Sequence, residues 1–209
     1  MEEIAKTIWG EFMGLGLSKS QERKVQIIHS AIKIFAKEGA ESLTYDLLAK
    51  KCGVTRQLII HYFPDRVDII KWGARFVRAH MQKFAVDQMS KYPSNKDQLT
   101  AYTRSTFEWT RNNPEYAKFW LYYYYLCSIK KTFKETNSIL VEMGHKRILA
   151  LLQSGYSKGE FANEPTLMSA KQIQNIITSG LLTVMTEDYQ DIGEKIEDWT
   201  VKGVMAITE

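Results

Sequence analysis

The 209-residue sequence is poor in residues that break helices or cross-link chains, with 4 Pro, 12 Gly and 2 Cys. So few Pro and Gly exclude collagen-like, linker-rich and many-turned β architectures, and they favour long helices. Cys52 and Cys127 lie 75 positions apart, which is no disulfide framework and no ligand cluster. This cysteine usage fits a reducing cytoplasm.

Long apolar runs and a strong excess of one charge are also missing. No apolar run approaches the roughly 18 residues of a membrane span, and Met1-Glu2-Glu3 opens without the basic region of a secretion signal. We therefore expect a soluble, cytoplasmic protein with no membrane partner. The formal net charge of +4 permits a nucleic-acid partner without demanding one. A hydrophobic share of 44% is enough to bury a core, which excludes intrinsic disorder.

Apolar residues recur at steps of three and four along most of the chain, which is the spacing of amphipathic helices. We predict an all-α fold, with an N-terminal three-helix head followed by a larger helical domain. The predicted division is an extension at 1–17, a head at 18–66 and a helical domain at 67–209. Helices are expected over residues 20–37, 45–51, 56–63, 65–91, 95–111, 114–128, 132–158, 165–189 and 192–207.

Two short helices joined by a turn at Gly53 carry the functional pattern. Thr55 is placed to cap the second helix, which presents Arg56, Gln57, His61 and Tyr62. A helix N-terminus binds phosphates, and its first turns reach base edges in the major groove, where Arg pairs with guanine and Gln with adenine. This is what a helix-turn-helix reader requires. On spacing alone, a compact three-helix unit with a solvated face fits equally well.

The sequence of this region favours the DNA-binding interpretation. Residues 28–39, Leu43-Thr44 and residues 49–55 resemble the DNA-binding head of the TetR (tetracycline repressor) family. Residues 61–66 resemble the end of its signature, with Arg66 where Lys is usual. The resemblance covers roughly residues 23–70 and implies a homodimeric transcriptional regulator, with a helical C-terminal domain that binds a small effector and dimerises. The predicted DNA-binding residues are Thr44, Thr55, Arg56, Gln57, Leu58, Ile60, His61, Tyr62 and Arg66.

Leu58 and Ile60 depart from the family pattern. Family members usually place a Thr and a Tyr there, and those side chains meet DNA phosphates. The two apolar side chains either read thymine methyl groups, or the head has drifted from ordinary operator binding. A third possibility is that both fold back and become buried beside Ile59.

Aromatic residues crowd positions 102–133, including the run Tyr122-Tyr123-Tyr124-Tyr125. Four consecutive Tyr on a helix point in all directions, so some must line a cavity, an interface or the solvent. Any single ring is more often core than ligand site. As a group, these rings suit a mostly apolar pocket with a few polar contacts, and we expect an apolar or aromatic effector. The predicted ligand-binding set is Phe84, Trp109, Trp120, Tyr123, Tyr124 and His145.

The last two predicted helices fit a dimer interface. Their apolar residues could form half of a four-helix bundle across a two-fold axis, although burial inside the monomer fits the spacing too. Residues 156–161 resemble the turn that precedes the dimer-forming helices of the TetR family. The extension at 1–17 fits a short amphipathic helix or a frayed arm.

The sequence gives no support for catalysis. The four His share no metal-ligand spacing, neither Cys has an adjacent His, and no phosphate-binding loop is present. We therefore expect no enzyme, no metal and no cofactor. The predicted function is a ligand-responsive DNA-binding regulator, a repressor by its family resemblance, acting as a homodimer on a pseudo-palindromic, double-stranded operator. The alternative is a helical small-molecule-binding or scaffold protein that kept the fold but lost operator binding.

Overall fold

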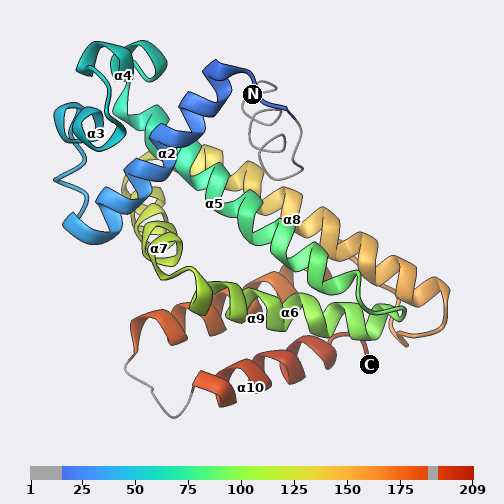
Figure 1. Ribbon diagram of the computed structural model, residues 1–209. Coiled ribbons are helices and arrows are strands. Elements are labelled where there is room, and N and C mark those ends of the chain that lie inside the picture. Colours follow the sequence, from blue (N-terminus) through green and yellow to red (C-terminus); the bar gives the residue numbers. More distant parts are fainter. Residues whose placement is uncertain (1–15, 188–192) are drawn as a thin grey trace. The chain divides into compact units, whose positions relative to one another are not determined.

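The computed structural model describes residues 16–187 and 193–209, and every regular element within these ranges is a helix (Figure 1). The all-α fold class predicted from the sequence is confirmed. In chain order the helices are α2 (Lys19–Glu38), α3 (Tyr45–Cys52), α4 (Arg56–Tyr62), α5 (Arg66–Met89), α6 (Asn95–Asn112), α7 (Pro114–Ile129), α8 (Lys131–Ser157), α9 (Leu167–Thr186) and α10 (Gly193–Met205).

Side-chain caps set where several helices begin. The Ser18 hydroxyl accepts a hydrogen bond from the Gln21 amide, and the Gln21 side chain accepts one from the Ser18 amide. Thr44, Thr55 and Thr166 cap α3, α4 and α9 through their hydroxyls. Each cap satisfies a backbone N–H that the first helical turn leaves unpaired, so a local signal fixes the start of the helix.

Predicted and observed helix ends agree closely, with a clear difference at α9. We expected a helix over residues 165–189, whereas α9 begins at Leu167 because Thr166 is its cap. It ends at Thr186, and the last two residues of the predicted range lie outside the described residues. The predicted extension at 1–17 lies almost wholly outside them as well.

The first compact unit contains the described residues up to His80 together with Asn113–Thr136. Within it, α2 packs on α3 and on α7, and α3 packs on α4. On α7, the Phe119 ring meets Phe35 of α2 edge-on, and the Tyr122 ring stacks on Phe35 with centroids 4.5 Å apart. The apolar core of α2, α3 and α4 is fully buried, which stabilises the head. It includes Ile27, Ile28, Ile32, Leu48 and Ile59.

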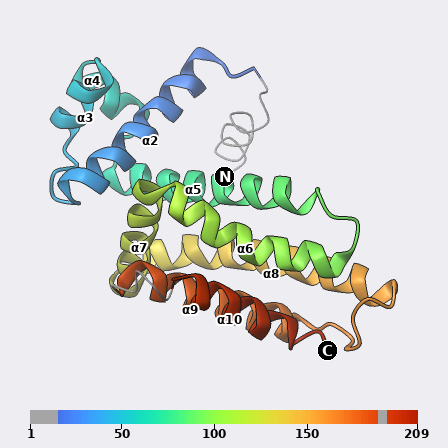
Figure 2. The ribbon, with the colours of Figure 1, turned by 60° about the horizontal axis from the view of Figure 1, so that its bottom comes forward.

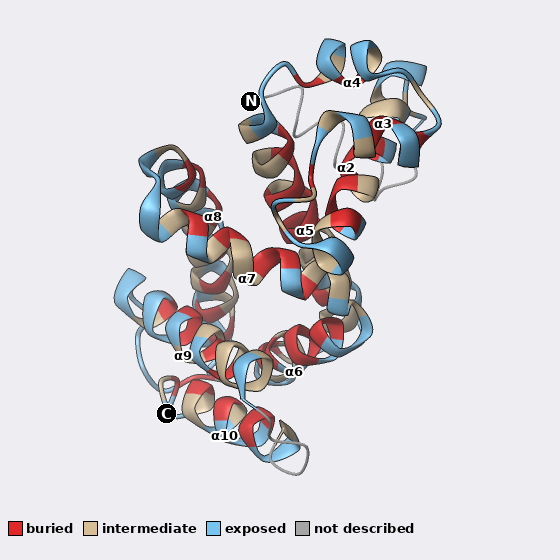
Figure 3. Cartoon of the chain, turned by 90° about the vertical axis from the view of Figure 1, so that its left-hand side faces the viewer, coloured by how far each residue is buried: buried red, intermediate tan, exposed pale blue. Residues whose placement is uncertain are grey.

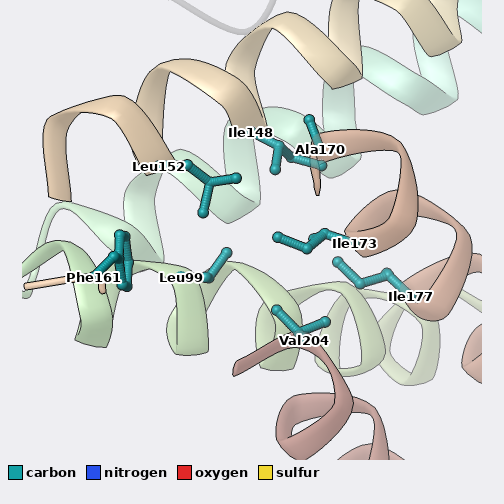
Figure 4. Close-up of a cluster of buried hydrophobic side chains, with 8 residues drawn as sticks. All are labelled: Leu99, Ile148, Leu152, Phe161, Ala170, Ile173, Ile177 and Val204. Atoms are coloured by element: carbon teal, nitrogen blue, oxygen red, sulfur yellow. The ribbon is translucent and has the colours of Figure 1, made fainter. Parts of the chain in front are cut away.

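The second compact unit contains Met81–Asn112 and Asn137–Glu209. Its core lies between α6, α8, α9 and α10 (Figure 4), and α10 packs on α9 and on α6. Figure 1 shows α9 and α10 side by side, and in Figure 2 α10 lies in front of α9. The central buried side chains are Leu99, Ile148, Leu152, Phe161, Ala170, Ile173, Ile177 and Val204.

An ionic clamp joins α6 to α10 within the second unit. Glu197 is buried, and its carboxylate accepts hydrogen bonds from Arg104 at 3.0 Å and from Arg111 at 2.7 Å. Arg104 also donates to Asp198 at 2.7 Å. Because a buried carboxylate needs such partners, the clamp fixes how α10 lies on α6.

Candidate nucleic-acid interface

A tight turn between α3 and α4 positions α4, the helix predicted to read DNA bases and called the reading helix below. Gly53 ends α3 with φ 65 and ψ 36, in the left-handed region that favours glycine. The Val54 amide then donates to the Ala49 carbonyl at 3.0 Å. Thr55, two residues after Gly53, caps α4 by accepting a hydrogen bond from the Leu58 amide at 3.3 Å. The helix-turn-helix predicted from the sequence is therefore present.

The reading helix is anchored to the rest of the head at the middle of its inner face and at its C-terminal end. Ile59 has no exposed surface, and Phe63 directly after α4 is buried and meets Trp72 of α5 edge-on at 5.8 Å between ring centroids. The Tyr45 hydroxyl lies 3.1 Å from the Phe63 carbonyl oxygen and 3.0 Å from that of Pro64. These contacts fix the position of α4 on the head, and reading bases at fixed positions requires such an anchor.

The outer face of α4 presents the polar residues that were predicted to contact DNA. Thr55, Arg56, Gln57 and His61 are exposed, and Tyr62 is partly exposed beside the His61 ring. Figure 3 shows this exposed surface in pale blue. The structure brings these five side chains together on one short helix, where each can reach a partner outside the protein.

Thr44 and Arg66 lie at the starts of the two neighbouring helices. Both are exposed, and Thr44 caps α3 by accepting from the Leu47 amide at 3.2 Å. Arg66 is the first residue of α5, immediately after Asp65, whose carboxylate accepts from the Val67 amide at 2.8 Å. Asp65 therefore caps α5, and Arg66 lies in the first turn of that helix.

Leu58 and Ile60 occupy different environments. Leu58 is partly buried, whereas Ile60 is 37% exposed and lies on the outer surface. The expectation that both fold back and become buried beside Ile59 is therefore wrong for Ile60. Ile59 fills the inward position by itself, and helical geometry turns the next residue about 100° away from it.

Two contributions to this surface were not predicted from the sequence. Asp46 on α3 forms an ion pair with Arg56 at 3.7 Å, and Tyr45 holds the end of α4 through the hydrogen bonds described above. Both depend on the angle between α3 and α4. No sequence spacing indicates such contacts, because they join residues of different helices.

The predicted ligand-binding residues fall in both units. In the first unit, the Trp120 ring stacks on Tyr123 at 5.7 Å between centroids and meets Tyr124 edge-on at 5.1 Å. Tyr123 is fully buried, and its hydroxyl donates to the Phe133 carbonyl oxygen at 3.1 Å. These three aromatic residues of α7 therefore form one cluster, which was predicted as part of a pocket.

Phe84, Trp109 and His145 belong to the second unit. Trp109 is almost fully buried, and Phe84 and His145 are partly buried. Their role in ligand binding stays a prediction. The described residues contain no helix long and apolar enough to cross a membrane, and no grouping of three or more His, Cys, Asp or Glu side chains placed to hold a metal ion.

Comparison with known proteins agrees with this architecture. Residues 27–71 match the family model of bacterial regulatory proteins, tetR family. These residues include most of α2, all of α3 and α4, and the start of α5. The curated protein sequences contain no match to the chain.

Solved structures share the fold over most of their length. A structure from Rhodococcus sp. assigned to the TetR family has a TM-score of 0.79 at 13% identity, covering 90% of this chain and 99% of that one. A TetR transcription regulator from Haloarcula marismortui has a TM-score of 0.75 at 15% identity, covering 90% and 99%. A structure from Saccharomonospora viridis assigned as a transcriptional regulator, in complex with choline, has a TM-score of 0.74 at 14% identity, covering 87% and 94%.

Identities this low show a common fold, whereas the match over residues 27–71 is a match of sequence. That segment coincides with the anchored helix-turn-helix and its exposed polar face. The chain therefore contains a tetR-family domain at residues 27–71 and has the fold of TetR-family transcriptional regulators.

Proposed function

We propose that the chain is a ligand-responsive transcriptional regulator that binds a double-stranded operator through α3 and α4. The observation that carries this proposal is the contrast within α4. Ile59 is fully buried, while Arg56, Gln57 and His61 are exposed around it. A helix anchored in this way can enter the major groove without moving relative to its own head.

The exposed residues divide into two roles. Arg56, Gln57 and His61 read base edges, and Thr44, Thr55, Tyr62 and Arg66 bind phosphates around them. Arg56 is paired with Asp46 in the free protein, but both side chains are exposed, so the pair contributes little stability. Arg56 can therefore leave Asp46 for a guanine at little energetic cost.

A gel-shift against DNA upstream of the protein's own gene tests this function. We expect binding that survives competitor DNA, and Gln57→Ala should weaken specific binding by about 1–3 kcal/mol while leaving non-specific binding unchanged. Lys146→Gln on α8, which removes an exposed charge paired with Glu142, is the control and should bind as the wild type does. Equal affinity for the upstream fragment and for random DNA would contradict the proposal.

One observation favours a second candidate function. Ile60 exposes an apolar side chain on a face that is usually polar and solvated in a DNA-binding helix. A protein that kept the fold but binds only a small molecule or another protein would tolerate this residue. Absence of any salt-sensitive DNA binding in the gel-shift would favour that candidate.

We further propose that α9 and α10 form the interface of a homodimer. A groove of about 480 Å³ runs between these two helices. Trp199 in its lining is 60% exposed, and Leu167 and Met168, at the other end of α9, are exposed as well. Exposed apolar surface of this kind is typical of an interaction site. The groove is lined by Ile176, Ser179, Gly180, Thr183, Glu187, Ile196, Trp199 and Thr200.

Two heads in such a dimer would face half-sites about one DNA turn apart, roughly 34–36 Å, or a multiple of that distance. Analytical ultracentrifugation should show a dimer at micromolar concentration, and Trp199→Arg should shift it towards monomer. Because Trp199 is largely exposed, the circular dichroism spectrum of the variant should stay unchanged. A wild-type monomer at that concentration would contradict this part of the proposal.

The effector is proposed to act near Trp120, Tyr123 and Tyr124, and to release the operator, as in a repressor. Only three residues separate the end of α4 from the start of α5, so a shift of α5 reaches the reading helix directly. By linkage, operator and effector must weaken each other's binding by the same factor. A compound that quenches tryptophan fluorescence saturably but leaves operator affinity unchanged would contradict the coupling.

A further inference from the structure

Two arginines lie on one face of α5, in a stretch of the helix that is mostly buried. Arg75 and Arg78 are three positions apart, which places them one turn from each other on the same side. Arg78 is only 8% exposed, and Arg75 is partly buried. Arginine is rarely withdrawn from solvent to this degree unless it is paired, and Arg78 does have partners within the protein, the Trp120 ring among them.

The two arginines lie beside the aromatic cluster of α7, formed by Trp120, Tyr123 and Tyr124. The Arg78 guanidinium lies over the Trp120 ring, 5.8 Å from its centroid. Arg75 lies close enough to the Tyr123 hydroxyl for each group to influence the other electrostatically. Since Trp120 and Tyr123 are stacked on each other, this part of the first unit combines an aromatic surface with two positive charges.

Arg75 forms no close ion pair within the residues that the structure describes. Within the described part of the chain, no carboxylate lies within 4.0 Å of its guanidinium, and no side chain or carbonyl accepts a hydrogen bond from it. Burial lowers the pKa of Arg75, and the acidic group that interacts with it, Asp68, lies two turns earlier on α5. A partly buried cation in this state gains stability from any anion that reaches it.

We propose that Arg75 and Arg78 bind the carboxylate of an acidic effector whose apolar body packs beside Trp120. The proposal rests on the ligand response proposed above and specifies its chemistry. A guanidinium offers paired N–H donors that match the two oxygens of a carboxylate, and such charge-assisted bonds are the strongest that a site of this kind can form. A quaternary ammonium such as the choline of the Saccharomonospora viridis structure would be repelled here.

Matched pairs of probes test the preference for an anion. Phenylacetate and octanoate, each beside its neutral amide, are added to the protein at equal ionic strength, and thermal unfolding is recorded. A ligand that binds only the folded state raises the unfolding midpoint. We expect each acid to bind about 10- to 100-fold more tightly than its amide, which is the range for a hydrogen bond to a charged group. Equal midpoints for acid and amide, or no shift with either acid, would overturn the proposal.

Variants locate the site. Arg75→Gln should remove the preference for the acid, and Arg75→Lys should keep part of it, since Lys retains the charge without the paired donors. Lys146→Gln removes one exposed charge far along the sequence and should keep the full preference. A preference that survives in Arg75→Gln would show that the acid binds elsewhere.

The unliganded protein provides a test that needs no probe. If Arg75 were part of the structural framework, Arg75→Gln would lower the unfolding midpoint by several degrees. If Arg75 serves to bind an anion, Arg75→Gln should instead unfold within about 2 °C of the wild type in the absence of ligand, or at a higher temperature. A large drop would overturn the proposal. Operator binding by the wild type is measured separately, so a protein that binds DNA but ignores both acids rejects only the acidic effector.

Discussion

The Tyr116 hydroxyl oxygen on α7 lies 2.8 Å from Nδ1 of His29 on α2. The His29 ring also meets Phe76 of α5 edge-on at 4.6 Å, so this histidine joins three helices of the first unit. Burial lowers the pKa of His29, and the positive charges of Lys33 and His80 lower it further. Burial therefore favours a neutral imidazole where α2, α5 and α7 meet.

Acidification should weaken the first unit. Since the folded-state pKa of His29 lies below its ordinary value of 6.5, the unfolded chain takes up the proton first as the pH falls. The stability from this residue is fully present above about pH 6.5 and is lost as the pH falls through the lowered pKa. Chemical denaturation at several pH values between about 7.5 and 5 should show this loss, and His29→Asn should make it smaller. If stability depended on pH equally in the wild type and in the variant, His29 would not be the residue responsible. Some pH dependence should remain in the variant, because burial lowers the pKa of His80 too.

Ile59→Ala and Ile60→Ala should differ sharply in stability. Ile59 is fully buried, so its truncation should cost about 2–5 kcal/mol of unfolding free energy. Ile60 is 37% exposed, so Ile60→Ala should change stability little. If Ile60 reads a thymine methyl group, its truncation should still reduce discrimination at that base pair. Denaturant unfolding and a binding-site selection on the same two variants measure both effects. Intact base preference in Ile60→Ala would exclude methyl reading.

Arg66→Ala should weaken binding to all DNA sequences similarly. Arg66 is exposed at the start of α5 and is proposed to bind a phosphate, so its loss removes one counterion release per protomer. The plot of log affinity against log salt concentration should become shallower by about one unit per protomer. A change confined to one operator sequence would instead assign Arg66 to base reading.

Two glycines of the second unit should respond to alanine with opposite signs. A Cβ on Gly180 would lie 2.4 Å from Thr200 Oγ1 and 3.0 Å from the Phe107 ring, so Gly180→Ala should force α9 and α10 apart. We expect a loss of about 1–3 kcal/mol. A Cβ on Gly203 would meet Ile176 at an ordinary 3.5 Å, so Gly203→Ala should gain up to about 1 kcal/mol from helix propensity. Thermal unfolding of both variants measures the difference. Equal effects would show that the two helices are not closely packed at Gly180.

The sequence by itself determined the helices of the head and the turn between them. Thr44 and Thr55 act on backbone amides three residues away, and the Gly53 conformation depends on its own missing side chain. Such signals depend only on residues close together in the chain, so they can be recognised from the sequence. The buried position of Ile59 follows from helical periodicity in the same way.

Only the tertiary structure decided which helix covers each face. In the tyrosine run, Tyr123 is fully buried while Tyr125 is 58% exposed, a difference that composition does not indicate. The contacts of Arg78 with Trp120 and of Tyr116 with His29 join residues 42 and 87 positions apart. Periodicity states which side of a helix is apolar, but the partner of that side is fixed by how helices distant in sequence pack together.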